Sequence, residues 1–402
     1  MPDSPSKAAM PLFLLLITLL IALNLRPALA SVGPLLAAMQ EELPLSYAGA
    51  SLLTSLPVMI MGIACFFGFA LAGRIGMGRT ISLSIGILTL ALLFRFRLDS
   101  TGMLILTALL AGLGIALIQC LLPALIKANF PGRVDQAMGL YITAIMAGAS
   151  MGSALSPWLA GFFEWRGGMG HWVWLALTAL LCWQLFLSRW HFPARPAASP
   201  TVRQSFWGNR RAWQLALLFG LSTAAFVCVL AWLAPFAMEQ GLNAQQAGLL
   251  LGFLTLMEVT AGLLFPAWAA RVRDRRPVLF SLCLLQLAGF AGLILFPQLS
   301  IWFWATLLGL GVGGMFPMVM IVTMDHQEDA VQAGELAAFV QGMGYLIASL
   351  APWGAGLIRD SLQSFSLAWG LLAGGACVLL TLCMSLTPAS YRSAFTLQSE
   401  PA

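Results

Sequence analysis

Charged side chains are scarce in this sequence, where 20 Lys and Arg and 15 Asp and Glu make up 9% of 402 residues. Soluble domains carry about 25% charged residues. So few charges cannot cover the surface of a soluble protein of this length, which excludes a soluble enzyme. The apolar share of 60% excludes a disordered or fibrous chain as well.

Metal-binding and disulfide patterns are also missing. The three histidines are scattered at positions 171, 191 and 326, and no CxxC pair occurs. All seven cysteines lie inside apolar stretches, which favours small apolar packing residues over a metal site or a disulfide framework. No Walker-type phosphate loop is present, so ATP coupling in this chain is not expected. We therefore expect no metal and no cofactor. The seven cysteines are Cys65, Cys120, Cys182, Cys228, Cys283, Cys377 and Cys383.

Long apolar runs dominate what is present. A membrane-spanning helix needs about 20 apolar residues to cross the hydrocarbon layer, and helices satisfy their own backbone polar groups there. The runs lack the alternation of an outer-membrane barrel. They predict an all-α membrane protein with twelve transmembrane helices at approximately Pro11–Met39, Tyr47–Ala72, Ile81–Phe94, Met103–Ile126, Met138–Phe163, Trp172–Trp190, Trp213–Met238, Gln246–Ala270, Val278–Phe296, Ile301–Met324, Glu335–Ile358 and Ser366–Leu386.

The first run has an alternative interpretation. Lys7 precedes it, and Ala28-Leu29-Ala30 resembles a signal-peptidase site. The run is longer than a secretory signal and is interrupted by Asn24, Arg26 and Pro27. We therefore favour a first spanning helix, which is kinked where Pro27 removes a backbone hydrogen bond.

Basic residues set the expected orientation. With the N-terminus inside, the cytoplasmic side carries nearly four times as many basic residues as the outside, so the positive-inside rule predicts cytoplasmic termini in a bacterial inner membrane. The net charge of +5 then reports topology and calls for no nucleic-acid partner. The cytoplasmic set is Lys7, Arg74, Arg79, Lys127, Arg133, Arg189, Arg195, Arg203, Arg210, Arg211, Arg271, Arg273, Arg275, Arg276 and Arg392; the outer set is Arg95, Arg97, Arg166 and Arg359.

The chain divides into two matching halves. Residues 191–212 form the longest polar stretch and predict a cytoplasmic linker between six-helix bundles at 11–190 and 213–387. Three short motifs recur six helices apart, in register, which indicates a duplication. They are Ser156–Gly161 with Ala351–Gly356, Gly112–Gly114 with Gly309–Gly311, and Ala48-Gly49 with Ala247-Gly248.

This organisation resembles the major facilitator superfamily of permeases. The loop Gly73–Arg79 resembles one copy of the superfamily's cytoplasmic motif, with Ile75 where that motif has an acid, and Asp274-Arg275-Arg276 resembles the second copy. The resemblance implies a central binding site between the halves and transport by alternating access. It also implies a gating role for Asp274 and Arg275.

A narrower resemblance is carried by Asn24–Pro27 and Ser31–Leu36 in the first run. These stretches resemble the cyanate permease and 2-nitroimidazole transporter group (CynX/NimT). Further matching stretches extend it over nearly the whole chain. They are Gly112–Ile115 with Gln119 and Pro123, Asp274–Arg276, Asp325-His326, Phe339–Gly342 and Ala351–Trp353. The resemblance implies a small-molecule substrate, which is imported or exchanged in the one case and exported in the other.

Arg26 is the strongest candidate for the substrate site. It lies about 22 Å along the first run at 1.5 Å per residue, beyond the reach of the cytoplasmic surface. An ionised side chain at that depth costs at least about 2.5 kcal/mol, so a cavity or a counter-charge must compensate. A guanidinium offers paired donors to a small anion. The alternative is a structural role for Arg26, either in an ion pair or bound to backbone carbonyls.

Other polar residues in the spans complete the predicted site. Glu258 is the one acid deep in the runs, and it could pair with Arg26, carry a proton or bind substrate. Asn24 beside the kink is a candidate substrate-binding residue. Gln119 and Gln341, on helices that border the cavity in the superfamily, are further candidates, and each of these two glutamines could instead tie helices together. Trp158 and Trp353 occupy matched positions and are candidates for an outer gate or for an interfacial belt.

The sequence thus predicts a monomeric, multi-pass secondary transporter of a small anionic or electron-rich polar solute, with proton coupling through Glu258 as a hypothesis. The alternative is an efflux transporter of a small toxic heterocycle such as a nitroimidazole, with Arg26 structural. An intramembrane enzyme or a sensor on the same fold is a weaker rival, because Arg26 and Glu258 stand without a nucleophile, a metal or a histidine in the spans.

Overall fold

The computed structural model describes residues 9–130, 133–187, 206–327 and 330–396. Every regular element in these ranges is a helix, which confirms the all-α prediction. Eleven helices are long and apolar enough to span a membrane, and the shorter apolar helix Val173–Leu187 takes the place of the sixth predicted span. Most of the predicted linker, residues 191–205, lies outside the described ranges, and the sixth run continues beyond them.

The helices follow the predicted runs, with the first run divided into three pieces. The helices are α1 (Ala9–Leu23), α2 (Pro27–Ala30), α3 (Val32–Glu42), α4 (Tyr47–Ile75), α5 (Met77–Phe94), α6 (Thr101–Asn129), α7 (Val134–Gly170), α8 (Val173–Leu187), α9 (Arg210–Glu239), α10 (Ala244–Ala269), α11 (Arg276–Leu295), α12 (Ile301–Asp325), α13 (Ala330–Leu362), α14 (Ser366–Met384) and α15 (Ala389–Thr396), with a short 3-10 turn at Arg95–Arg97.

The third and fifth spans show where local sequence sets the boundaries. α5 and the following 3-10 turn form a continuous span from Met77 to Arg97, which begins four residues before the predicted run and ends three residues after it. The fifth span ends as predicted at Phe163, where the backbone leaves the helical region and Glu164 adopts a φ of 58°. The residues that follow form a separate turn of helix inside the range of α7.

The first span is broken around Arg26. Pro27 has no N–H to donate to the carbonyl of Leu23, and a turn separates α1 from α2. A second interruption falls at Ser31, whereas Pro34 lies within α3 without breaking it. Gly148 of α7 packs against the break, because a Cβ atom there would lie 2.1 Å from the freed carbonyl oxygen of Leu23. The kink predicted at Pro27 is therefore present, and α7 is shaped to receive it.

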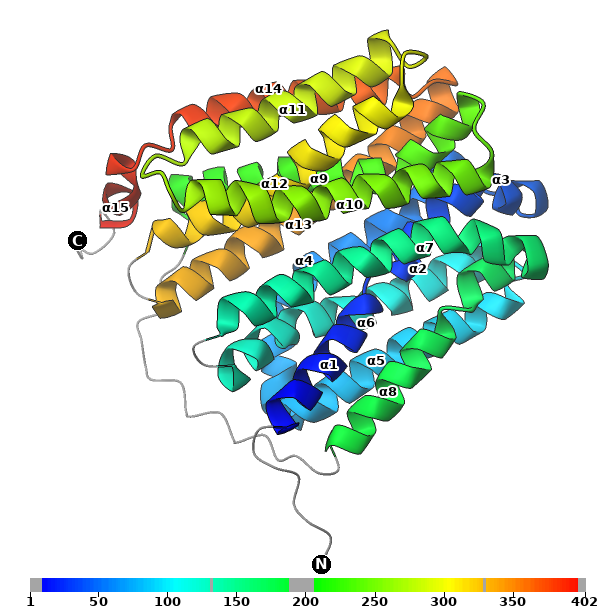
Figure 1. Ribbon diagram of the computed structural model, residues 1–402, viewed down its shortest axis with the longest axis horizontal. Helices are drawn as coiled ribbons and strands as arrows, with labels where there is room; N and C mark the ends of the chain where they lie inside the picture. The colour runs from blue at the N-terminus through cyan, green and yellow to red at the C-terminus, as the bar shows by residue number, and fades with distance from the viewer. Residues whose placement is uncertain (1–8, 131–132, 188–205, 328–329, 397–402) are drawn as a thin grey trace, which may run out of the picture.

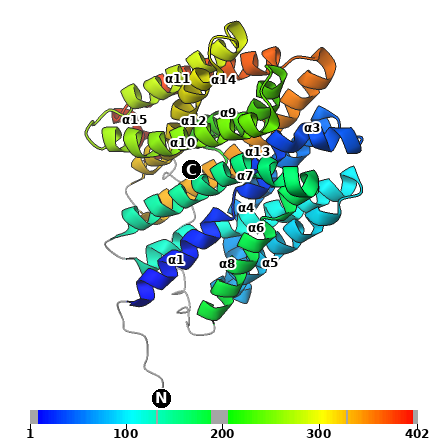
Figure 2. The same ribbon diagram turned by 45° about the vertical axis from the view of Figure 1, so that its right-hand side comes forward.

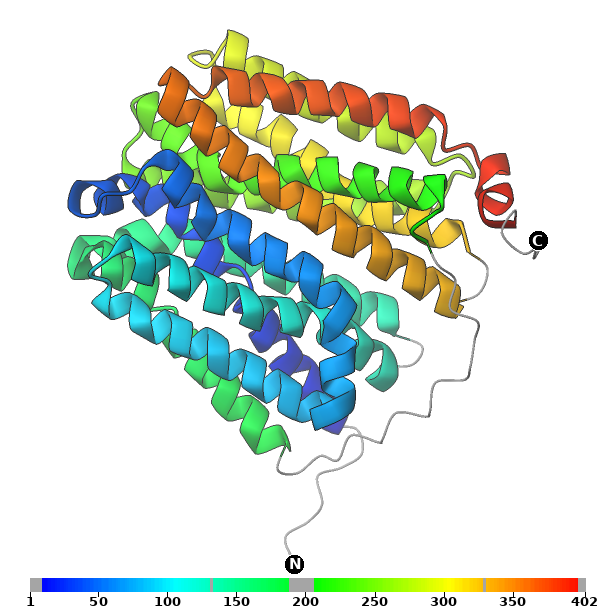
Figure 3. The same cartoon turned by 180° about the vertical axis from the view of Figure 1, so that it is seen from behind.

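The helices gather into two groups that lie side by side. Figure 1 shows α1–α8 in the lower part of the molecule and α9–α14 in the upper part, and the separation persists in the turned view of Figure 2. α4 packs against α13 and α7 against α10 along the junction, and Figure 3 shows the first pair from behind. We use "linker end" for the end of the molecule where α8 stops and α9 begins, and "opposite end" for the other.

One of the three repeated motifs, Gly112–Gly114 with Gly309–Gly311, makes equivalent contacts in the two groups. Gly112 of α6 lies against Pro57 of α4, and Gly309 of α12 lies against Leu254 and Met257 of α10. Two residues later in each helix, Gly114 contacts α5 and Gly311 contacts α11. In each half, Gly112 or Gly309 packs the fourth span against the second. Gly114 or Gly311 packs the same fourth span against the third.

Candidate functional site

The break in the first span holds Arg26 inside the protein. Arg26 precedes α2 with a φ of −123° and a ψ of −24°, and only 7% of the residue is exposed. Its guanidinium carbon lies 5.3 Å from the ring centroid of Phe226 on α9, which is a cation–π arrangement across the junction. A side chain from one half therefore reaches a helix of the other half near the middle of the spans.

Three further polar side chains surround this guanidinium. Tyr141 of α7, Glu258 of α10 and Tyr345 of α13 all lie within electrostatic range of Arg26. Each is at least nine-tenths buried. The structure thus brings together side chains from α7, α9, α10 and α13 around the broken first span.

Arg26 and Glu258 interact without forming a close ion pair. In the described part of the chain, every Lys or Arg nitrogen lies more than 4.0 Å from the Glu258 carboxylate. Nε of Arg26 is sealed from solvent and has no hydrogen-bond partner there. The backbone of Glu258 packs directly against Gly313 of α12, where a Cβ atom would lie 2.3 Å from the Glu258 Cα atom. The two charges therefore influence each other without direct contact.

Asn24 holds the broken helix. Its side-chain amide donates to the carbonyl of Leu20 at 2.8 Å and to that of Leu175 in α8 at 3.4 Å. Both bonds satisfy backbone groups, and the second ties the break to its own half. The structure therefore gives the Asn24 amide a role in holding the position of Arg26, while its predicted contact with substrate stays a prediction.

The glutamines differ in their surroundings. Gln119 of α6 has a sealed side-chain oxygen that lacks a hydrogen-bond partner among the described residues. Gln341 of α13 is half-buried and lies four residues, about one helical turn, before Tyr345. Gln286 of α11 instead donates to the carbonyl of Gly311 at 3.1 Å and joins two helices, as expected of a structural residue.

The two matched tryptophans lie on exposed faces. Trp158 is 53% exposed and packs edge-on against Phe162, and Trp353 is 44% exposed. Such positions in a spanning helix fit the belt alternative. Their predicted role in gating stays a prediction.

The second loop motif forms ion pairs within one half. Arg275 donates to Asp325 at the end of α12 at 3.2 Å and to the carbonyls of Val272 and Ala269. Asp274 pairs with Arg276 at 2.6 Å, and the hydrogen bonds from that guanidinium hold the pKa of Asp274 below its ordinary value. These bonds fix the loop between α10 and α11 against α12. The predicted gating role of Asp274 and Arg275 is not tested by them.

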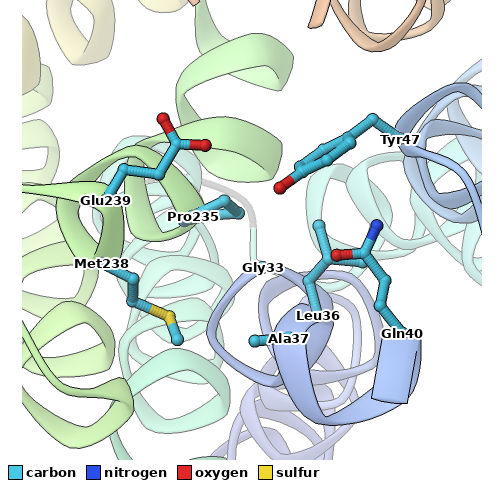
Figure 4. A pocket seen from close by; sticks show the side chains of 8 residues that line it. All are labelled: Gly33, Leu36, Ala37, Gln40, Tyr47, Pro235, Met238 and Glu239. Atoms are coloured by element: carbon cyan, nitrogen blue, oxygen red, sulfur yellow. The ribbon is translucent and has the colours of Figure 1, made fainter. Parts of the chain in front are cut away.

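A small pocket lies between the halves at the opposite end. Figure 4 shows it between α3, the start of α4 and the end of α9, where Gln40, Tyr47 and Glu239 supply the polar groups. Beside it, the carboxylate of Asp360 accepts hydrogen bonds from the backbone N–H groups of Tyr47 at 2.9 Å and Ala48 at 2.8 Å. The pocket is lined by none of the predicted site residues, and its surroundings close the junction at this end.

Tyr141, Tyr345 and Phe226 were not predicted as site residues. Tyr141 and Tyr345 fall in the interior of long apolar runs, whereas Tyr47 begins a run and Tyr391 lies outside the runs, and this placement was the available signal. Placing a phenol in a membrane span costs less free energy than placing a charge there. The position of these tyrosines within a span therefore did not mark them as functional.

A comparison with protein families decides the classification. The model of the Major Facilitator Superfamily matches residues 14–352. This chain belongs to the major facilitator superfamily. The superfamily is one of transporters, so the chain is a multi-pass membrane transporter, as the twelve runs and the repeat predicted.

Two named transport proteins are similar to this chain along most of their length. The cyanate transport protein CynX of Escherichia coli K12 is 36% identical over 94% of this chain and 98% of that protein. The 2-nitroimidazole transporter of the same organism is 30% identical over 87% of this chain and 88% of that protein. The predicted resemblance to the cyanate permease and nitroimidazole transporter group is thereby confirmed.

Solved superfamily structures share the fold. The inward-open xylose transporter XylE from E. coli superimposes with a TM-score of 0.75 at 12% identity, covering 95% of this chain and 99% of that one. The nucleoside transporter NupG gives a TM-score of 0.74 at 15% identity, with coverage of 94% and 99%. At these identities the similarity establishes the arrangement of helices.

Proposed function

We propose that this superfamily member is a secondary active transporter that moves a small anionic or electron-rich polar solute across the bacterial inner membrane by alternating access. Arg26 binds the solute in this proposal. The observation that carries it is a buried guanidinium at the break of the first span, which faces helices of the other half and has no close counter-ion among the described residues. The similarity to a cyanate transport protein supports a small anion.

An anion supplies what the site lacks. A buried charge without a partner is unfavourable, and a bound anion compensates it while accepting two parallel hydrogen bonds from the guanidinium. The ring of Phe226 lies 5.3 Å from the guanidinium carbon, and the terminal nitrogens of Arg26 have no hydrogen bond among the described residues and are left for the solute. Asn24 holds the break, and Gln119 and Gln341 supply further hydrogen bonds. Asp274 and Arg275 act in gating, whereas the exposed faces of Trp158 and Trp353 favour an interfacial belt.

Alternating access would proceed between the two bundles, 11–190 and 213–387. The positive-inside rule puts the linker end and both termini in the cytoplasm. The contacts at Tyr47 and Asp360 then close the outer side. We propose that the protein works as a monomer, that it needs no cofactor, and that it performs no enzymatic reaction.

The flux of candidate solutes into proteoliposomes tests this function. Wild type, Arg26→Gln and the control Arg97→Gln, which alters an exposed arginine, are compared with cyanate, nitrate, short carboxylates and 2-nitroimidazole. We expect an anion to move in wild type and in the control, and its flux to fall by about tenfold or more in Arg26→Gln, since each hydrogen bond to a charged group contributes about 1.5–3 kcal/mol. Anion flux that is unchanged in Arg26→Gln would contradict the proposal.

Proton coupling through Glu258 is the second part of the proposal. Glu258 is buried, unpaired by a close cation in the described structure, and in electrostatic range of Arg26, so binding of a proton and of an anion would influence each other. We expect Glu258→Gln to transport without a response to an imposed pH gradient. If the flux through Glu258→Gln still follows the imposed pH gradient, Glu258 does not couple transport to protons, and the proposed role of Arg26 is unaffected.

A second candidate function is the export of a small neutral heterocycle. The similarity to a 2-nitroimidazole transporter favours it. In that case Arg26 is structural, and 2-nitroimidazole moves equally well in wild type and in Arg26→Gln while no anion moves. The same flux experiment therefore separates the two functions.

A further inference from the structure

Tyrosine is rare in this chain, and two of its four tyrosines face the same guanidinium. Tyr141 on α7 and Tyr345 on α13 are 4% and 7% exposed, and each lies within electrostatic range of Arg26. They are also within electrostatic range of each other. The first belongs to the N-terminal half and the second to the C-terminal half.

Both phenolic hydroxyls lack a protein partner. Across the described residues neither hydroxyl makes a hydrogen bond, and neither is among the polar atoms that are sealed from solvent. Tyr391 differs, because its hydroxyl donates to the carbonyl of Leu386. A nearly buried hydroxyl normally has a hydrogen-bond partner. The partner of Tyr141 and of Tyr345 must therefore be water or a bound solute.

The remaining polar atoms around Arg26 are open in the same way. The terminal nitrogens of Arg26 and the carboxylate of Glu258 have no hydrogen bond within the described structure and are not sealed. The four side chains thus reach accessible space from α7, α10, α13 and the broken first span. The ring of Tyr345 is held edge-on against Phe219 at 5.1 Å, which restricts where its hydroxyl can point.

The chemistry of this set favours an acceptor-rich anion. The guanidinium and the two phenols all donate hydrogen bonds, and hydrogen bonds from such donors to an ionised acceptor are the stronger class. A solute that bridges both phenols contacts both halves at once. Its binding would then depend on the spacing of α7 and α13 and would link occupancy to the arrangement of the halves.

We propose that Tyr141 and Tyr345 are the specificity-determining pair of this site, which donate their hydroxyl hydrogens to a small anion held by Arg26. This inference rests on the proposed anion transport. It adds one binding residue from each half and assigns the substrate class to oxygen- or nitrogen-terminated anions small enough to lie between the two phenols.

The variants Tyr141→Phe and Tyr345→Phe test the pair, with Tyr391→Phe as the matched control. Removing only the hydroxyl keeps the ring packing. We expect the KM for the transported anion to rise by about tenfold in each site variant, with the maximal rate within about twofold of wild type, and both values unchanged in the control. A structural role would lower the maximal rate and the yield of monodisperse protein without this split.

Two native thiols give a second readout. Cys65 lies within electrostatic range of Tyr345, and Cys120 within range of Tyr141; both are partly exposed. We expect the anion to slow their labelling by N-ethylmaleimide, resolved by mass spectrometry, and the protecting concentration to rise in the phenylalanine variants in parallel with KM.

The outcomes separate the two levels of inference. If wild type transports an anion in an Arg26-dependent manner while both phenylalanine variants keep the wild-type KM and protection, the tyrosine pair is wrong and the transport function stands. If wild type neither transports nor is protected by any anion, the proposed function is wrong and the pair is overturned with it.

Discussion

At the scale of single residues, the break at Arg26 depends on a glycine that approaches it from another helix. Gly148 of α7 lies against the carbonyl of Leu23, which Pro27 leaves without its helical partner. A methyl group at position 148 would overlap that oxygen, so either α7 or the break must shift. The position of Arg26 therefore depends on the packing of α7.

Gly148→Ala tests this dependence, with Gly139→Ala as the control on the same helix. A Cβ atom at Gly139 meets no atom within 4 Å. We expect Gly148→Ala to lower the free energy of unfolding by about 1–3 kcal/mol through overpacking and to weaken substrate binding, while the control changes neither. Thermal unfolding and transport kinetics check this, and wild-type values for Gly148→Ala would refute it.

The sequence singled out Arg26, Pro27 and Glu258 because a charge or a proline in a membrane span has a large and local energetic cost. The structure shows the kink and buries Arg26 and Glu258 within electrostatic range of each other, and their role in binding stays a prediction. The sequence did not predict Tyr141, Tyr345 or Phe226. These residues belong to three helices, and their proximity follows from the packing of the halves rather than from any spacing along the chain. The sequence also could not predict that the Asn24 side-chain amide donates hydrogen bonds to backbone carbonyls.

At the scale of elements, the end of α13 caps the beginning of α4 across the junction. The Asp360 carboxylate accepts from two N–H groups at the α4 N-terminus, where the helix dipole favours a negative charge. Arg359 stacks over Tyr47 at 4.8 Å and pairs with Glu239 at 2.7 Å. These contacts link α4, α9 and α13 at the opposite end.

Asp360→Asn is expected to loosen this closure, because hydrogen bonds to a charged group contribute about 1.5–3 kcal/mol. A cysteine introduced at Ala37, which lines the neighbouring pocket, should label faster from outside in Asp360→Asn than in the unmodified background. Asp99→Asn is the control for loss of an exposed charge at that end. Equal labelling in all three proteins would show that the contact does not hold the end closed.

The short helix α15 docks on a buried histidine. His326 packs against the ring of Tyr391 at 4.3 Å, and its Nδ1 lies 2.7 Å from the carbonyl oxygen of Val322. Burial lowers the pKa of His326 from 6.5 to about 4; nearby Arg211 acts in the same direction, and Asp325 opposes it.

The unfolded state therefore binds more protons than the folded one between about pH 6.5 and pH 4, so stability falls as the pH is lowered through this window. We expect a loss of about 2 kcal/mol at pH 5 relative to pH 7. His326→Gln should remove most of this loss. Thermal unfolding midpoints measured from pH 7 to pH 4.5 check it; parallel curves for both proteins would rule it out.

At the scale of the whole molecule, the repeat in the sequence predicted part of the packing inside each half. Gly112 and Gly309 make the same helix contact in the two halves, so a sequence repeat marked a structural one. Twelve runs and their order followed from apolar length alone. The contacts between the halves also involve repeated motifs: a Cβ atom at Gly356 of α13 would lie 3.0 Å from the Ala48 Cα atom of α4, and one at Gly248 of α10 would lie 3.1 Å from Pro157 of α7. The sequence did not predict these pairings, because a repeat shows that two stretches are related and not that either contacts another helix.

The central claim is that a small anion binds at Arg26 between the halves. Equilibrium binding of cyanate and nitrate to the purified protein, compared between wild type and Arg26→Gln by calorimetry, tests it most directly. We predict saturable binding of at least one anion to wild type and a loss of affinity on the order of 10- to 100-fold in Arg26→Gln. Equal affinities in the two proteins, or binding of 2-nitroimidazole with no anion binding, would contradict it.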